Sequence, residues 1–187
     1  MLGIYDYDLI TYKAAFAGET RLVEVTHKPT GRRKIFKNKT EFLGRGKKVG
    51  GWLGEINKAR ESKGQSPFNA EDFEVETIRE VEPLEHVLST TKRMINNINK
   101  AAGVEKYCGY LGDGNGFRYD LSTLWEYKGN RKDAIRPVYK TEVAEYILKH
   151  HNAQKDSHYE ADDRVIMKAI EVGVDNSIVI TTDKDSY

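Results

Sequence analysis

HYEADD at His158–Asp163 and TTDKD at Thr181–Asp185 are two acidic clusters separated by one predicted helix and one predicted strand. The apolar residues of Arg164–Glu171 recur at helical spacing, and Ile178–Ile180 is a short β-branched run typical of a buried parallel strand. One cluster therefore opens a helix, and the other follows the carboxyl end of the next strand. Because ligands of open α/β sheets bind outside the carboxyl ends of the strands, we expect both clusters to face one pocket.

Acidic residues follow predicted strands at two further places. Leu2–Tyr5 is a short apolar strand candidate that leads into Asp6 and Asp8, and Tyr107–Leu111 leads in the same way to Asp113. Asp8 is expected to cap the helix that follows it, which leaves Asp6 as a ligand. These strands alternate with predicted helices, so the expected fold class is α/β, with a mostly parallel central sheet flanked by helices and an acidic rim. The clearest helices are predicted over 9–17, 83–102 and 141–151.

The acidic rim has the chemistry of a site for divalent cations. Carboxylate oxygens without accompanying His or Cys ligands suit Mg²⁺ or Mn²⁺ rather than zinc or copper. Two such ions about 3.5–4 Å apart are the usual clamp for in-line phosphodiester cleavage. The simpler alternative is that these acids only stabilise a helix N-terminus through its dipole. His150 and His151 adjoin each other, which is not the spacing of a metal-binding pair, and we expect both at the surface.

The segment 21–82 differs from the rest of the chain and is predicted to be an insertion. Leu22–His27 alternates in polarity and can pair with 32–36 as a hairpin. Short helices are expected near 38–42 and 52–60, and Phe73–Val81 alternates acidic and apolar residues as a strand does. The insertion is therefore expected to carry secondary structure of its own.

This insertion is strongly basic in its first half. Between Lys28 and Arg60, eleven Lys and Arg residues stand against two acidic ones. Such a stretch is either a solvated surface or a patch that follows a phosphate backbone, with Phe36 and Trp52 as stacking platforms. Under the second interpretation the DNA-binding candidates are Arg32, Arg33, Lys34, Lys37, Lys47 and Lys48.

The composition excludes several other classes of protein. The 187 residues are enough for one α/β domain with an inserted module, and the net charge of +1 gives no overall preference for a polyanion. The single cysteine, Cys108, excludes internal disulfides and a Cys-rich zinc site, and its apolar surroundings predict a buried thiol. The sequence shows neither a signal-peptide pattern nor a long apolar run, so we expect a soluble, cytoplasmic protein without a membrane partner.

Five motifs, in this order, make the chain resemble the 5′-nuclease family. That family comprises the 5′-3′ exonuclease domain of bacterial DNA polymerase I, the flap endonucleases and the phage 5′-3′ exonucleases, and it has a PIN-like fold. The order of the motifs is far more specific than any one of them. As they stand in this chain, the motifs are Asp6-Tyr7-Asp8 ahead of a helix, Asp113 followed by Phe117-Arg118, YKGNR at Tyr127–Arg131, EADD at Glu160–Asp163 and TDKD at Thr182–Asp185.

The resemblance implies a metal-dependent 5′-3′ exonuclease or flap endonuclease that hydrolyses DNA or RNA–DNA during phage-type replication or repair. Its partners would be 5′ ends, flaps or branched duplexes of DNA, in the host cytoplasm if the chain is phage-encoded. Mg²⁺ or Mn²⁺ is the implied cofactor, with two ions in the complete enzyme. By resemblance, Lys128 and Arg131 contact the scissile phosphate, Tyr127 stacks on a base and Arg118 contacts DNA. The implied metal-site positions are Asp6, Asp113, Glu160, Asp162, Asp163, Asp183 and Asp185.

The chain also departs from the family pattern. Tyr7 replaces the usual glycine of the first motif, and the 21–82 segment matches none of the motifs. The family continues beyond TDKD with a third carboxylate pair and a helix-hairpin-helix-like DNA clamp, whereas this sequence stops at Tyr187. A further segment or a second chain is therefore expected to complete the site. Two alternatives stay open: a PIN-like ribonuclease, which needs no clamp, and a protein that binds branched or single-stranded DNA without cutting it.

Overall fold

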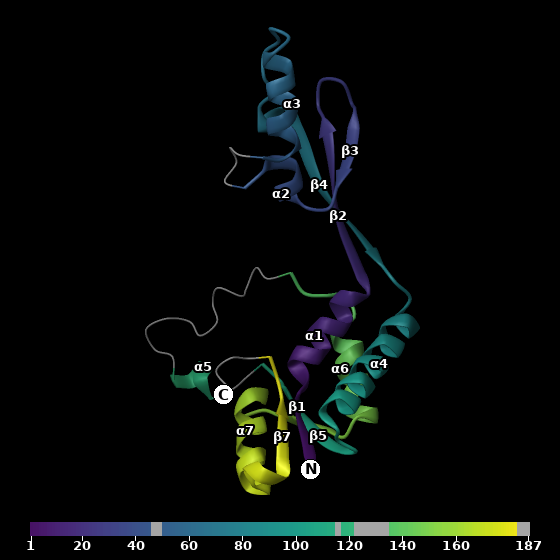
Figure 1. Ribbon diagram of the computed structural model, residues 1–187, viewed down its shortest axis with the longest axis vertical. Helices are drawn as coiled ribbons and strands as arrows, with labels where there is room; N and C mark the ends of the chain where they lie inside the picture. The colour runs from purple at the N-terminus through teal and green to yellow at the C-terminus, as the bar shows by residue number, and fades with distance from the viewer. Residues whose placement is uncertain (46–49, 115–116, 122–134, 183–187) are drawn as a thin grey trace. The chain divides into compact units, whose positions relative to one another are not determined.

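A computed structural model describes residues 1–45, 50–114, 117–121 and 135–182 of the chain (Figure 1). It divides into two compact units. Unit 1 consists of Met1–Glu19 and Glu82–Tyr187, and unit 2 is the intervening segment Thr20–Val81. The chain therefore leaves unit 1 once, after its first helix, and returns to it once. This continuous segment nearly coincides with the 21–82 range that the sequence sets apart.

Unit 1 contains a four-stranded sheet in the order β6-β5-β1-β7. Every neighbouring pair in this sheet is parallel, so the carboxyl ends of all four strands meet at one edge. This confirms the predicted parallel α/β sheet. The order also puts β1 in the interior of the sheet, with β5 on one side and β7 on the other. The strands are β1 (Leu2–Asp6), β5 (Lys106–Gly112), β6 (Ala153–Asp156) and β7 (Ser177–Ile180).

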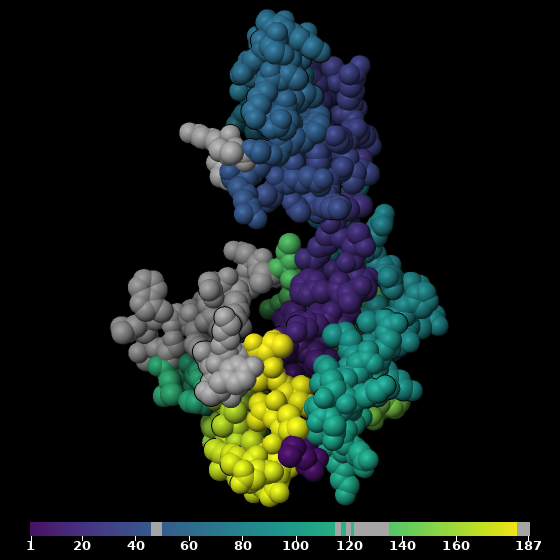
Figure 2. Space-filling view, viewed as in Figure 1, coloured from purple at the N-terminus to yellow at the C-terminus, as the bar shows by residue number. Residues whose placement is uncertain are grey.

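Helices cover both faces of this sheet, as is usual for a parallel sheet. On one face α1 (Tyr7–Ala17) packs against α4 (Leu84–Ala102) and α6 (Lys140–His150), and Figure 2 shows α4 along the side of α1. On the other face α7 (Ala161–Val172) packs against β1, β5 and β7. Adjacent residues of β1 point to opposite faces, so Tyr5 belongs to the first core and Ile4 to the second.

In the centre of the sheet, position 109 has no room for a residue larger than glycine. This residue pairs with Tyr5 across β1 and β5, and the Tyr7 ring lies over it, stacked on the Tyr5 ring at 5.0 Å between centroids. A Cβ atom at Gly109 would lie 2.5 Å from Tyr7 Cε2 and 2.6 Å from the Tyr5 carbonyl oxygen. The tyrosine pair therefore occupies the space that a side chain on β5 would need. Nearby, Cys108 is only partly buried, and burial raises the pKa of its thiol.

The prediction that His151 lies at the surface is wrong. His151 is 5% exposed, its Nδ1 lies 3.2 Å from the Tyr107 hydroxyl, and its carbonyl accepts a hydrogen bond from the Tyr7 hydroxyl at 2.9 Å. Helix α6 ends at His150, so His151 leaves the helical spiral and turns inward under these rings. Burial lowers the pKa of its imidazole. His150 is exposed, as expected.

Unit 2 has its own sheet and its own core. The three strands lie in the order β3-β2-β4, and β2 and β3 form the predicted antiparallel hairpin. The two predicted helices and the predicted third strand are also present. The elements are β2 (Glu19–His27), β3 (Arg33–Phe36), α2 (Lys39–Leu43), α3 (Trp52–Glu61), a 3₁₀ turn at Ala70–Asp72 and β4 (Phe73–Val81).

Aromatic rings fill the core of unit 2. Phe42 is fully buried, and its ring lies 5.5 Å from that of Phe36, 6.1 Å from that of Trp52 and 5.4 Å from that of Phe73. Phe36 itself is only 4% exposed, so the expectation that it serves as a stacking platform for bases is wrong. It lies opposite Val23 on the covered face of the hairpin, where alternation along β3 turns it inward.

Candidate functional site

The edge where the strands of unit 1 end collects most of the described acidic candidates. Asp6 is the last residue of β1, Asp113 follows β5, and Asp156 ends β6. The N-terminus of α7 carries Glu160, Asp162 and Asp163. Segments far apart in the sequence are thus brought to one edge by the parallel topology.

Asp6 is the most enclosed of these carboxylates, being 9% exposed. Its Oδ1 accepts a hydrogen bond from the backbone N–H of Asp8 at 3.1 Å, so Asp6 is the N-cap of α1. The expectation that Asp8 caps this helix is therefore wrong, because Asp8 already lies in the first helical turn. The Thr181 hydroxyl, just beyond β7, lies 3.5 Å from the other oxygen of Asp6.

Asp8 connects α1 to the end of β5. Its Oδ2 accepts a hydrogen bond from the backbone N–H of Gly112 at 3.2 Å. A Cβ atom at Gly112 would lie 3.0 Å from that oxygen and 3.8 Å from the backbone nitrogen of Ala161. Asp8, which the sequence did not mark as a ligand, therefore stands among the predicted metal-site positions.

The electrostatics of the edge show that its carboxylates interact. Burial, followed by the negative charges of Asp8 and Asp162, raises the pKa of Asp6 to about 6 against the opposing effect of the N–H groups of Leu9 and Asp8. A carboxylate with a raised pKa holds its charge at a cost in free energy. A cation placed among Asp6, Asp8 and Asp162 would remove that cost.

A second group of acids is already compensated by a cation of the protein. The Arg118 guanidinium donates two hydrogen bonds to Asp163, at 2.6 and 2.8 Å, and one to Glu160 at 3.0 Å. Arg118 opens the short helix α5 (Arg118–Leu121) and reaches back to the start of α7. It was predicted to contact DNA, and in this structure it holds two of the predicted metal-site carboxylates.

Asp156 shapes the loop before α7 and was not singled out in the sequence. Its Oδ1 accepts hydrogen bonds from the backbone N–H groups of His158 and Tyr159, each at 2.8 Å, and its Oδ2 lies 3.1 Å from Arg164 Nε. The N–H of Tyr159 and then that of His158 hold the pKa of Asp156 below its usual range, with help from Arg164. An aspartate that bonds the backbone two residues on is a local turn signal, which was available in KDSHYE.

Asp6, Asp8 and Asp162 offer only carboxylate oxygens, the type of donor that Mg²⁺ and Mn²⁺ prefer. Within the described ranges, no three His, Cys, Asp or Glu side chains converge closely enough to hold a metal ion. The remaining predicted site residues lie outside the described residues: Tyr127, Lys128, Arg131, Asp183 and Asp185.

The basic residues of unit 2 that were predicted to bind DNA differ in their contacts and exposure. Arg33 is paired with Glu24 at 3.5 Å, and the Lys34 ammonium lies 5.0 Å from the centre of the Trp52 ring. Arg32 and Lys37 are exposed on either side of β3. Lys47 and Lys48 lie outside the described residues.

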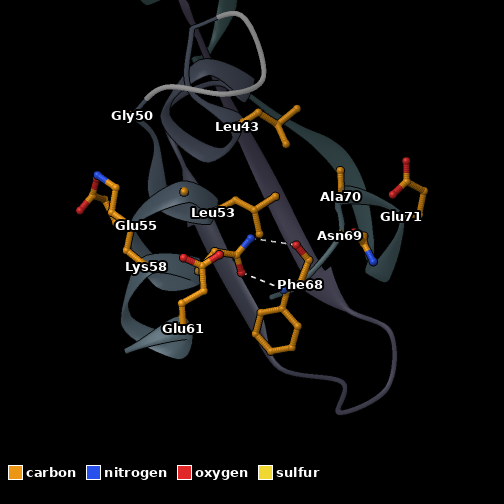
Figure 3. A pocket seen from close by; sticks show the side chains of 12 residues that line it. Leu43, Gly50, Leu53, Glu55, Lys58, Glu61, Phe68, Asn69, Ala70 and Glu71 are labelled. Carbon is orange, nitrogen blue, oxygen red and sulfur yellow. Dashed lines mark hydrogen bonds and ion pairs between the residues drawn. The ribbon is translucent and has the colours of Figure 1, made fainter. Parts of the chain in front are cut away.

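Unit 2 also contains a hollow of about 700 Å³ between α3 and the chain around Phe68 (Figure 3). The Asn57 side chain holds the two walls together through the backbone of Phe68, at 2.8 and 2.9 Å. Three acids and one lysine lie along the hollow: Glu55, Glu61, Glu71 and Lys58. Because its charge is mainly negative, this hollow is unsuited to nucleic acid.

Replacing Arg118 with Gln is expected to destabilise the metal-free protein by about 1–3 kcal/mol, because Glu160 and Asp163 then lose the guanidinium that they share. Thermal unfolding in EDTA measures this loss. If metal binds at this edge, Mg²⁺ restores part of it. Arg93→Gln in α4, whose guanidinium bonds only the hydroxyl of Thr90 at 3.4 Å among described partners, is the matched control. Equal unfolding temperatures for Arg118→Gln and the parent in EDTA would contradict the structural role of this pairing.

Comparison of the chain with protein-family models, with curated proteins and with solved structures found no match. Among the described residues, no helix combines the length and the apolar character needed to cross a membrane. Function is therefore inferred from the geometry of unit 1 and from the order of the motifs along the chain.

Proposed function

We propose that this chain is a divalent-metal-dependent nuclease of the 5′-nuclease type with a PIN-like core, which hydrolyses phosphodiester bonds in DNA or RNA–DNA. The observation that carries the proposal is Asp6, a carboxylate buried at the carboxyl end of the interior strand β1 beside the charges of Asp8 and Asp162. An enclosed carboxylate near other acids is costly unless a cation accompanies it. The parallel sheet supports the proposal, because its edge is where such folds hold their ligands.

Each group of residues has a defined task in this proposal. Asp6, Asp8 and Asp162 would supply oxygen ligands, together with Asp183 and Asp185, which follow β7 in the sequence. Bound Mg²⁺ or Mn²⁺ would supply Lewis-acid stabilisation of the phosphoryl oxygens and would activate water. Lys128 and Arg131 would bind the scissile phosphate by charge-assisted hydrogen bonds.

The pairing of Arg118 with Asp163 and Glu160 favours one other function. An arginine that neutralises two acids permits a stable fold without any metal. In that case the chain binds branched or single-stranded DNA without cutting it. The two functions differ in their need for metal, which makes them separable by experiment.

Cleavage of a 5′ flap, a blunt duplex and a single-stranded RNA, each with Mg²⁺ and with EDTA, tests the proposed function. We expect cleavage of the flap only with metal, and its loss in the double variant Asp183→Asn, Asp185→Asn. Cleavage of RNA alone would make the chain a ribonuclease. DNA binding without cleavage would make it the non-cleaving binder, and parent-rate cleavage by the double variant would remove those two acids from the site.

A further inference from the structure

A pocket of about 320 Å³ adjoins the acidic edge of unit 1. Its walls come from α1, the end of β5, the chain that leads into α6, α6 itself and β6. Asp8 and Asp113 belong both to this pocket and to the acidic edge, so a ligand in the pocket lies next to the proposed metal site. Pockets for small ligands span about 300–1,000 Å³, so this one suits a single nucleotide rather than a duplex.

Three cationic side chains from separate segments line the pocket. Arg136 precedes α6, Lys140 is the first residue of α6, and Lys155 lies on β6. The Lys140 ammonium lies 4.5 Å from the centre of the Tyr12 ring. The pocket also contains the acids Asp8, Asp113 and Glu145. Lys140 and Lys155 are therefore the two lysines that the pocket offers to a negatively charged ligand.

Two further features favour a negatively charged ligand in the pocket. The eleven-residue helix α6 begins there, and its N-cap, Tyr139, makes no side-chain capping bond, so its first N–H groups and its dipole favour an anion. Thr11 lines the pocket from α1, is 0% exposed, and its hydroxyl has no hydrogen-bond partner among the described residues. A buried hydroxyl without a partner is uncommon and indicates a missing ligand or water.

Part of the pocket lining is apolar. Leu111, Leu148 and Pro137 line the pocket, and these side chains suit the sugar or the base of a nucleotide. Cationic and apolar side chains in one small pocket match the chemistry of a nucleotide that ends in phosphate. A terminal phosphomonoester carries more negative charge than a backbone diester, about −1.5 to −2 at neutral pH, so it gains more from the ammonium groups of Lys140 and Lys155.

We propose that this pocket binds the 5′-terminal phosphate and the first nucleotide of the nucleic-acid substrate. This inference rests on the proposed function for the identity of the ligand. It adds that the end of the strand is recognised by its phosphomonoester, at a place beside the cleavage site rather than within it. Substrates with a 5′-phosphate should therefore bind more tightly than the same strands with a 5′-hydroxyl.

Fluorescence anisotropy on the full chain in EDTA tests this directly. One oligonucleotide is compared with a 5′-phosphate, a 5′-hydroxyl and a 3′-phosphate. We expect about tenfold tighter binding of the 5′-phosphate form, as one or two charge-assisted hydrogen bonds provide. The double variant Lys140→Gln, Lys155→Gln should lose this preference. Lys149→Gln, an exposed lysine of α6 that is not among the residues lining the pocket, should keep it.

The outcomes separate this inference from the proposed function, because binding in EDTA does not depend on cleavage. Metal-dependent cleavage without a preference for a 5′-phosphate would contradict the proposed role of the pocket but not the proposed nuclease activity. A preference that persists in the double variant, or one for the 3′-phosphate, would also contradict that role. Equal affinity for a free nucleoside 5′-monophosphate and for the oligonucleotide would contradict recognition of the end of a strand. Loss of the preference in a double variant whose circular dichroism and melting match the parent would support it, whether or not DNA is cut.

Discussion

Replacing Asp6 with Asn is expected to abolish metal-dependent cleavage and to raise the melting temperature of the metal-free protein. Asn keeps the N-cap of α1, since its side-chain oxygen also accepts the N–H of residue 8. It removes the buried charge, whose pKa rises to about 6 from an ordinary 3.8. A difference of about two units corresponds to roughly 3 kcal/mol, which the folded protein regains at neutral pH. Loss of a metal ligand should cost at least about 10³-fold in rate.

The stability that Asp6→Asn adds should depend on pH. The folded protein holds the Asp6 proton more tightly than the unfolded chain does, so the wild type loses stability as pH rises from about 4 to 6. The gain from Asp6→Asn should therefore be full at pH 7 and vanish near pH 4. Thermal melts in EDTA at both values, with Asp175→Asn as the control at an exposed carboxylate, measure it. An equal gain at pH 4 and pH 7 would contradict the electrostatic cause.

Replacing Phe42 with Ala is expected to unfold unit 2 and leave unit 1 folded. Truncating a fully buried phenylalanine typically costs about 3–5 kcal/mol, and Phe42 touches three other rings of a small core. The core clusters of unit 1 share no residue with this cluster. Amide hydrogen exchange should show lost protection in Thr20–Val81 and retained protection in β1 and β5.

The same variant tests the basic surface of unit 2. If that surface follows a phosphate backbone, DNA binding weakens and the log–log salt dependence flattens by about 0.9 for each lost phosphate contact. Ile35→Ala, at a side chain that is 54% exposed on the other face of β3, is the control and should change stability by less than about 0.5 kcal/mol. An unchanged salt slope with unit 2 unfolded would make this basic segment an ordinary solvated surface.

The acidic edge could be anticipated from sequence because it depends on a local pattern. A short apolar strand followed by an acid and then a helix fixes the place of Asp6 without knowledge of strand order, and the helical spacing after Glu160–Asp163 places that cluster at a helix N-terminus. The strand order itself could not be anticipated, because any permutation of four parallel strands leaves the same acids at the same edge. The partner of Arg118 was equally hidden, since it lies more than forty positions along the chain.

The sequence signals failed where the local pattern was weak. Strand β6 reads AQKD, which is short and polar because it lies at the edge of the sheet, so it carries no apolar run to recognise. Asp156 was missed along with it. Which of Asp6 and Asp8 caps α1 depends on a single residue's backbone angles at the strand end, and those are set by pairing with β5 and β7.

The Glu82 N–H donates a hydrogen bond to the Gly18 carbonyl at 2.9 Å. This bond joins the point where the chain leaves unit 1 to the point where it returns from unit 2. While unit 2 is folded, unit 1 therefore folds as if these ends were joined by a very short connection. Once unit 2 unfolds, the same ends must be closed across a flexible loop of the whole 20–81 segment. Each doubling of loop length costs about 0.6 kcal/mol, and about five doublings separate the two cases, or roughly 3 kcal/mol. The stabilities of the two units are thus coupled through chain entropy alone, without any requirement for contact between them.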